Sequence, residues 1–143
     1  MLIIHDKARE EMIDDALSAF PDECCGFLFG EEAADERIIT VIRVVNNAKE
    51  GDKRRRFEIA PEDYVRAERF ADENGLQLLG VYHSHPNHPA IPSEHDREAA
   101  QPYFSYIIIS VINNEWAGTR SWRLNDEQRF EEETISDYQL IKN

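Results

Sequence analysis

Two histidines separated by one residue, His83 and His85, follow the apolar run 76–82. Side chains alternate faces along an extended segment, so both imidazoles would point the same way and could reach one metal ion. Asp96 follows a proline-rich turn and begins a helix-like segment, from which it could fold back as a third ligand. Two histidines and one carboxylate leave the fourth position of a tetrahedral zinc site open, as a catalytic site requires. Water held there would be a nucleophile near neutral pH if a base stood nearby.

Ser93 allows two interpretations. It stands directly before the acidic stretch 94–98, and a serine followed by acidic residues in a first helical turn is typical of a helix N-cap. The functional alternative is a hydroxyl that donates a hydrogen bond to the oxyanion formed when metal-bound water attacks a carbonyl. Both interpretations remain open from the residues alone.

Together these residues resemble the motif of the JAMM zinc metalloproteases, a family also called MPN+ or Mov34/PAD-1. The motif is His-x-His-Pro, six residues, Ser, two residues and Asp, and it is matched at His83, His85, Pro86, Ser93 and Asp96. The resemblance extends from about residue 3 to residue 122. It implies that Zn²⁺ is the cofactor and that the two histidines and the aspartate are its ligands.

A second segment, 21–30, resembles the region of this family that carries an upstream glutamate. Glu23 matches the general base of the family. The resemblance implies that Glu23 takes a proton from zinc-bound water and passes it to the leaving amine.

The resemblance also implies a three-layer α/β fold, in which helices flank a mixed central β-sheet as in cytidine deaminases (the JAB/MPN fold). The sequence pattern favours the same class, because helices and strands interleave. The Cys-x-x-Cys and His-x-Glu motifs of zinc deaminases are absent, which argues against base deamination. The expected helices are 6–20 and 61–74, the expected strands are 24–29, 38–45, 57–59, 76–82, 104–112 and 115–124, and 31–36 is an expected charged turn.

The length of 143 residues suits one domain with a sizeable core. We expect the JAMM domain to cover 1–124, with 125–143 an acidic C-terminal tail of the same domain. This tail is weakly apolar, and it could add an edge strand or stay mobile.

The formal net charge is −13, with 29 acidic against 16 basic residues, which argues against nucleic acid as a partner. The basic run 53–56 is an exception: it could bind substrate, or it could be solvated charge beside the edge strand expected at 57–59. No apolar run is long enough to span a membrane and no signal peptide is evident, so we expect a cytoplasmic protein. The adjacent cysteines Cys24 and Cys25 are poorly placed for an internal disulfide, which fits a reducing compartment.

The leading hypothesis is a zinc-dependent hydrolase that cuts a peptide or isopeptide bond at the C-terminus of a ubiquitin-like protein. Compact members of the family resemble the prokaryotic type that acts on sulfur carriers ending in Gly-Gly. One alternative is a RadC-like protein, although Ser84 stands where that group typically has Asn; another is a catalytically silent MPN scaffold. His88 and His95 are interpreted as surface residues or as neighbours of the ligands. The oligomeric state stays open.

Overall fold

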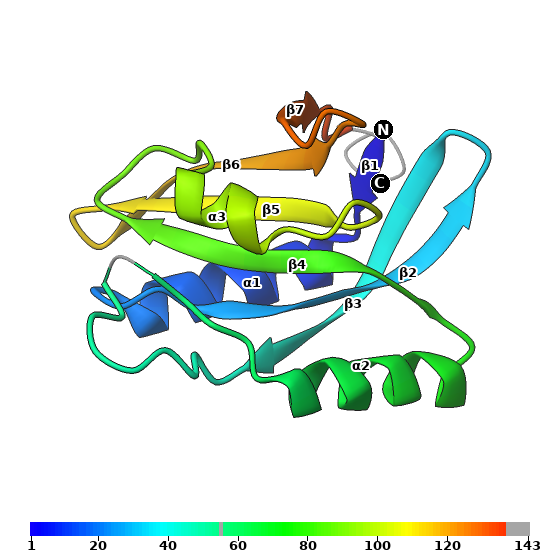
Figure 1. The fold of residues 1–143 in the computed structure, drawn as a ribbon, viewed down its shortest axis with the longest axis horizontal. Helices are drawn as coiled ribbons and strands as arrows, with labels where there is room; N and C mark the ends of the chain where they lie inside the picture. The colour runs from blue at the N-terminus through cyan, green and yellow to red at the C-terminus, as the bar shows by residue number, and fades with distance from the viewer. Residues whose placement is uncertain (55, 137–143) are drawn as a thin grey trace.

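A seven-stranded mixed sheet lies between two layers of helices in the computed structural model, which describes residues 1–54 and 56–136 (Figure 1). The strand order is β1-β3-β2-β4-β5-β6-β7, in which β1 with β3 and β4 with β5 are parallel and the other pairs are antiparallel. The predicted α/β class with a mixed sheet is confirmed. The bounds are β1 Leu2–Ile4, α1 Asp6–Ala19, β2 Cys25–Ala33, β3 Glu36–Val45, α2 Pro61–Glu73, β4 Gln77–Pro86, α3 Glu94–Ala99, β5 Ser105–Ile112, β6 Glu115–Leu124 and β7 Phe130–Glu133.

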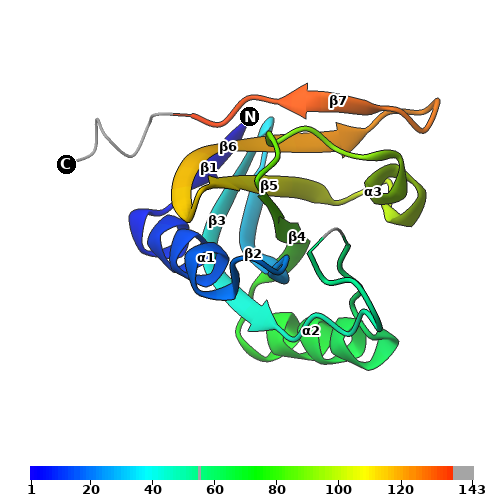
Figure 2. The same ribbon diagram turned by 90° about the vertical axis from the view of Figure 1, so that its left-hand side faces the viewer.

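The helices cover opposite faces of the sheet (Figure 2). Helix α1 buries Ala8, Met12 and Ala16, which recur every fourth residue and therefore form one apolar stripe against the sheet. Helix α2 packs on the other face through Ala67 and Ala71. Successive residues along the strands point to opposite faces of the sheet, so they contribute in turn to the apolar core under α1 and to the one under α2. None of the described helices is both long and apolar enough to cross a membrane.

Strand β4 lies in the middle of the sheet. It pairs with β2 on one side and with β5 on the other. Gly80 allows the close approach to β5, because a Cβ at this position would lie 1.9 Å from the carbonyl oxygen of Ser105. The strand continues beyond residue 82 to Pro86, so His83 and His85 belong to its C-terminal part. A strand paired on both sides is a rigid base for a site.

Two local predictions are wrong. Residues 57–59 do not form a strand, because the ring of Phe57 stacks on His83 and the backbone N–H of Glu58 is bound by the side chain of Asn47. The charged turn expected at 31–36 is shorter, since β2 and β3 extend through most of it as a hairpin. Its acidic residues are exposed, and exposed strands tolerate charge.

The described part of the C-terminal tail forms an edge strand, one of the two possibilities that the sequence left open. Strand β7 pairs with β6, and the chain then reaches β1 at the opposite edge of the sheet (Figure 2). The N–H of Leu2 donates to Thr134 O at 2.9 Å, and the N–H of Ser136 donates to Leu2 O at 2.8 Å. The apolar tail residues Tyr138, Leu140 and Ile141 lie outside the described residues.

Candidate metal centre

The central strand β4 carries both histidines of the motif. His83 and His85 lie two residues apart near its C-terminal end, so their side chains leave the sheet on the same face. Their Nε2 atoms are 3.1 Å apart. The ring of Phe57 stacks on His83, with centroids 4.4 Å apart and planes inclined by 25°, and limits its rotation. The structure thus brings the two imidazoles together.

Asp96 reaches the histidines from the first turn of α3. Its Oδ2 lies 3.3 Å from His83 Nε2 and 3.1 Å from His85 Nε2. Ser93 is the N-cap of this helix: its Oγ accepts from the N–H of Asp96 at 3.1 Å, and its own N–H donates to Asp96 Oδ2 at 2.9 Å. The N-cap interpretation of Ser93 is confirmed. This reciprocal capping box fixes the carboxylate as well as the helix start.

The three facing atoms fit a single metal ion. Two ligands about 2.0 Å from a tetrahedral zinc ion stand about 3.3 Å apart, close to the three observed separations. His85 Nδ1 donates to Pro89 O at 2.9 Å, so the proton is on Nδ1 and the lone pair of Nε2 faces the other two groups. Within the described residues, the metal-ligating side chains that converge in this way are His83, His85 and Asp96.

The electrostatics of the cluster favour the forms that bind metals. Burial lowers the pKa of His83, and the negative charge of Asp96 opposes this only in part. Burial alone would raise the pKa of Asp96, but the attraction of His83, hydrogen bonds with His83 and His85, and the N–H of Ser93 hold it below its usual range. Neutral imidazole and ionised carboxylate are the ligand forms, so the directions of the pKa shifts at His83 and Asp96 favour metal binding.

Glu23 lies between α1 and β2, where it is 5% exposed. Its backbone is held on both sides: the N–H donates to Lys53 O at 2.6 Å, and the carbonyl accepts from Asn47 Nδ2 at 3.2 Å. Its buried Oε1 has no hydrogen-bond partner among the described residues. Glu23, His85 and Ser93 line one open depression of about 560 Å³. Glu23 therefore lines the same open depression as His85 of the ligand cluster, while its unpartnered Oε1 is buried.

Asn47 and Ser84 support Glu23, and the sequence analysis did not single out either for this role. The Asn47 side chain binds the carbonyls of Glu23 and Arg56, and its Oδ1 accepts from the N–H groups of Lys49 and Glu58, so one residue organises the β3–α2 loop. Asparagine in a polar loop is a general signal of a turn and does not identify the partner.

Ser84 lies between the two histidines and points to the other face of β4. Its Oγ accepts from the N–H of Cys24 at 2.9 Å, and its own N–H donates to the carbonyl of Cys24 at 3.2 Å. The strand that carries the candidate ligands therefore also fixes the residue that follows Glu23. Cys24 and Cys25 are both buried and free, as the sequence predicts.

The remaining histidines of the motif region stay outside the ligand cluster. His88 is exposed and lines the open depression beside His85. His95 points towards a second, more apolar pocket of about 360 Å³, whose wall includes His83, Asp96, Phe57, Ile108 and Phe130. The cluster thus lies between an open depression on one side and an apolar pocket on the other.

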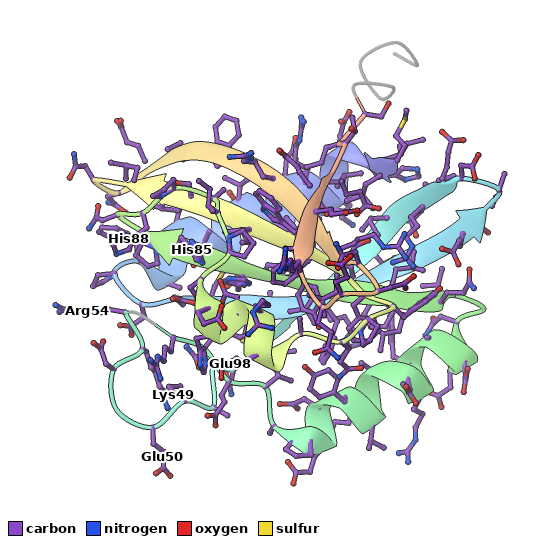
Figure 3. The ribbon with its side chains drawn as sticks, turned by 45° about the horizontal axis from the view of Figure 1, so that its top comes forward. Lys49, Glu50, Arg54, His85, His88 and Glu98 are labelled. Carbon is purple, nitrogen blue, oxygen red and sulfur yellow. The ribbon has the colours of Figure 1, made fainter. Side chains whose placement is uncertain are left out.

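The basic run lies beside this site. Figure 3 shows Lys49, Glu50 and Arg54 on the β3–α2 loop, at the same end of the molecule as His85 and His88. Lys53 and Glu23 line the same shallow hollow. Residues 57–59 form no strand, so this run does not lie beside an edge strand as expected. Lys53, Arg54 and Arg56 are exposed to solvent.

The protein without a bound metal ion should lose stability as the pH rises from 6.5 to 8. Burial, and then the charges of Asp96 and Asp52, raise the pKa of Glu23 from 4.5 to about 9. The folded protein keeps this proton where the unfolded chain has released it, so the free energy of unfolding should fall by up to about 1.4 kcal/mol per pH unit. His83 gives the opposite slope, because its pKa is lowered from 6.5, but only below pH 6.5.

Urea unfolding of the chelator-treated protein at pH 6.5, 7.2 and 8.0 would measure this slope. Glu23→Gln should largely remove it, because an amide does not titrate. An equal slope in the variant would assign the pH dependence to other groups.

A comparison with known proteins identifies the family of this chain. Residues 5–125 match the family model described as prokaryotic homologs of the JAB domain. The chain belongs to this family. The resemblance to the JAMM/MPN proteins is therefore confirmed.

Two curated relatives carry names that describe activities. A desampylase of Pyrococcus furiosus is 33% identical over 113 residues, which cover 79% of this chain and 74% of that protein. A probable TtuB-protein conjugate cleaving protease of Thermus thermophilus is 40% identical over 51 residues, 36% of this chain and 34% of that protein. The first comparison extends over most of the JAB domain.

The fold is shared with solved structures. A protein of Desulfitobacterium hafniense superposes with a TM-score of 0.83 at 32% identity, covering 95% of this chain and 92% of that one. A JAB1/MPN domain protein of Archaeoglobus fulgidus superposes with a TM-score of 0.56 at 19% identity, covering 96% and 100% of the two chains, and shows the common fold alone.

Proposed function

We propose that this JAB-domain protein is a zinc-dependent isopeptidase that releases ubiquitin-like proteins from their conjugates. The convergence of His83, His85 and Asp96 beside the buried carboxylate of Glu23 is the observation that carries the proposal. A silent MPN scaffold fits this arrangement less well, because the candidate ligands and the candidate base are all retained and mutually oriented. The relatives named for desampylation and for conjugate cleavage support the same reaction class.

Each residue has a distinct role in the proposed reaction. His83, His85 and Asp96 would hold the zinc ion, which supplies Lewis-acid activation of water and of the scissile carbonyl. The carboxylate of Glu23 would accept a proton from the attacking water and return it to the leaving amine. The raised pKa of Glu23 applies to the metal-free site, and the charge of a bound dication would lower it towards neutrality.

Ser93 combines structural and chemical roles in this proposal. Its Oγ already accepts from the N–H of Asp96, which leaves the hydroxyl proton free to donate. The hydroxyl lines the same depression as Glu23 and His85. A donor in this place would stabilise the oxyanion that develops on the scissile carbonyl.

We propose that the substrate is a ubiquitin-like protein of the sulfur-carrier type with a Gly-Gly tail. The site is an open depression bordered by short loops, which suits a thin extended tail more than a bulky side chain. A peptide bond and an isopeptide bond after the last glycine would both reach the same candidate metal site and the same side chains of Glu23 and Ser93. The free, buried cysteines fit a cytoplasmic location.

A cleavage assay tests this function. The substrates would be a ubiquitin-like carrier fused through its terminal glycine to a reporter, and the same carrier joined to a lysine side chain. We expect the zinc-loaded protein to release the carrier, 1,10-phenanthroline to stop the reaction, and added zinc to restore it. The non-chelating isomer 1,7-phenanthroline and a fusion with valine in place of the last glycine are controls. Absence of cleavage of both substrates by protein that contains zinc would refute the proposal.

Neutralising the basic loop should weaken substrate binding without stopping the chemistry. The change Lys53→Ala/Arg54→Ala/Arg56→Ala removes positive charge near Glu23 in a chain that is otherwise acidic. We expect KM for a carrier fusion to rise about three- to tenfold, with kcat nearly unchanged, because exposed charges act mainly on encounter and are screened by salt. The difference should shrink in 0.5 M NaCl.

A matched control removes three exposed basic residues elsewhere, in Lys7→Ala/Arg66→Ala/Arg69→Ala. This variant has the same net charge. An equal rise in KM in the control would show a general charge effect and would contradict a specific role of the loop.

A further inference from the structure

Three consecutive backbone carbonyls of the loop after β4 each accept a hydrogen bond from a different side chain. His88 O accepts from Ser110 Oγ at 2.6 Å, Pro89 O accepts from His85 Nδ1 at 2.9 Å, and Ala90 O accepts from Trp122 Nε1 at 3.0 Å. The middle contact orients a candidate ligand. The two outer contacts come from different strands, β5 and β6.

The two outer contacts hold the carbonyls on either side of Pro89 O. Pro89 has no N–H, so the His88–Pro89 peptide unit has no donor and is held through His88 O by Ser110. Pro89 O also accepts from the N–H of Ile91 at 2.8 Å within the loop, and the next carbonyl, Ala90 O, is held by Trp122. Ser110 is 4% exposed and Trp122 is half-buried, so both hydrogen bonds are partly shielded from water.

The start of the loop is anchored separately. The N–H of Asn87 donates to Val111 O at 2.6 Å, and Asn87 Oδ1 accepts from the N–H of Asn113 at 2.9 Å. These bonds hold the loop to the end of β5 even without Ser110 or Trp122. Loss of the outer contacts should therefore change the orientation of Pro89 O and His85 more than the overall fold.

We propose that Ser110 and Trp122 are positioning residues for the metal ligand His85, acting through the carbonyls on either side of Pro89. This inference rests on the proposed metal site. A histidine ligand whose other ring nitrogen donates to a fixed carbonyl is held in one tautomer and one orientation, and loss of such support typically costs about 10- to 100-fold in metal affinity. Ser110 and Trp122 contact the neighbouring carbonyls and not His85 itself. We therefore expect a loss of metal affinity near the lower end of this range when both contacts are removed.

The chain offers matched controls for both changes. Ser105 is also a buried serine on β5 with a hydrogen-bonded hydroxyl, but its partner is Arg37 at the other end of the sheet. Trp116 is also a tryptophan on β6 with a hydrogen-bonded Nε1, but its partner is Thr119 on the same hairpin. Ser105→Ala and Trp116→Phe thus remove the same groups away from the loop.

The experiment measures Co²⁺ binding to the metal-free full chain. Affinity is obtained by competition with a chromophoric chelator, and the visible absorption of bound Co²⁺ reports the coordination geometry independently of activity. We expect the double variant Ser110→Ala/Trp122→Phe to bind about tenfold more weakly, with a changed absorption band. Each single variant should show a smaller change in the same direction. Ser105→Ala and Trp116→Phe should keep the wild-type affinity and spectrum, even if they lower the thermal midpoint.

The outcomes distinguish failure of the positioning role from failure of the proposed metal site. If wild-type protein binds Co²⁺ and the double variant has the same affinity and absorption band, the positioning role is refuted while the metal site stands. Equal losses in the controls would also refute it, because the effect would then follow general destabilisation. If wild-type protein binds neither Co²⁺ nor Zn²⁺, the proposed function fails and this inference fails with it.

Discussion

Glu23→Gln should retain zinc and lose turnover by at least about a hundredfold. Glutamine keeps the size of the side chain and removes only its ability to accept and return a proton. Glu23 is suited to this role because it is buried, its backbone is fixed by Lys53 and Asn47, and its Oε1 has no partner among the described residues. An unpaired buried carboxylate is costly to folding, so the amide should not weaken the protein.

The measurement is kcat/KM on a cleavable carrier fusion, with the zinc content of the same sample. Asp22→Asn is a matched control, because Asp22 is the preceding residue but is exposed. Unchanged turnover in Glu23→Gln would refute its role as the base. Loss of zinc together with turnover would mean that Glu23 acts on the metal itself.

His83→Ala should reduce bound zinc from about one ion per chain to a small residue. His83 is 1% exposed, its Nε2 lies within 3.3 Å of both other candidate ligand atoms, and no described side chain is placed to substitute for it. Asp96→Asn should weaken binding less than loss of an imidazole, because the amide oxygen keeps a neutral donor in place.

Elemental analysis after purification without chelator or histidine tag would test this expectation. His88→Ala and His95→Ala are the controls, since both residues lie beside the cluster but outside it, and both variants should keep their zinc. Far-ultraviolet circular dichroism would show that His83→Ala is folded. Full zinc content in His83→Ala would contradict the proposed ligand set.

The sequence predicts the class of the fold and the three candidate metal ligands from local patterns, whereas Glu23 is identified only through the resemblance to the JAMM family. Apolar periodicity places α1, α2 and strands β2 to β6, but not β1, and the fixed spacing from His83 to Asp96 spans one strand end, one loop and one capped helix start. The contacts within this segment, including that from His85 to Pro89, join residues at most thirteen positions apart. Such geometry follows from short-range spacing.

The supporting contacts could not be predicted in this way, because they join residues that are distant in the sequence. Ser110 is 22 residues from His88, and Trp122 is 32 residues from Ala90. Asn47 binds Glu23 across 24 residues. Serine, tryptophan and asparagine are common on strands and in loops, and the residues next to them in the sequence do not indicate which residue they contact. The strand expected at 57–59 fails for the same reason, since Phe57 packs on His83 instead of joining a neighbouring strand.

The pairing of residues 134–136 with β1 has a consequence for how the protein is made. Among the described strands β1 is synthesised first, yet it obtains its second neighbour only when the ribosome has added Ser136. Contacts between the two ends of a chain form slowly, because a long loop must close first. We therefore expect sheet closure to be a late step of folding, and a nascent chain interrupted before Thr134 to expose two unpaired strand edges that can associate with other chains.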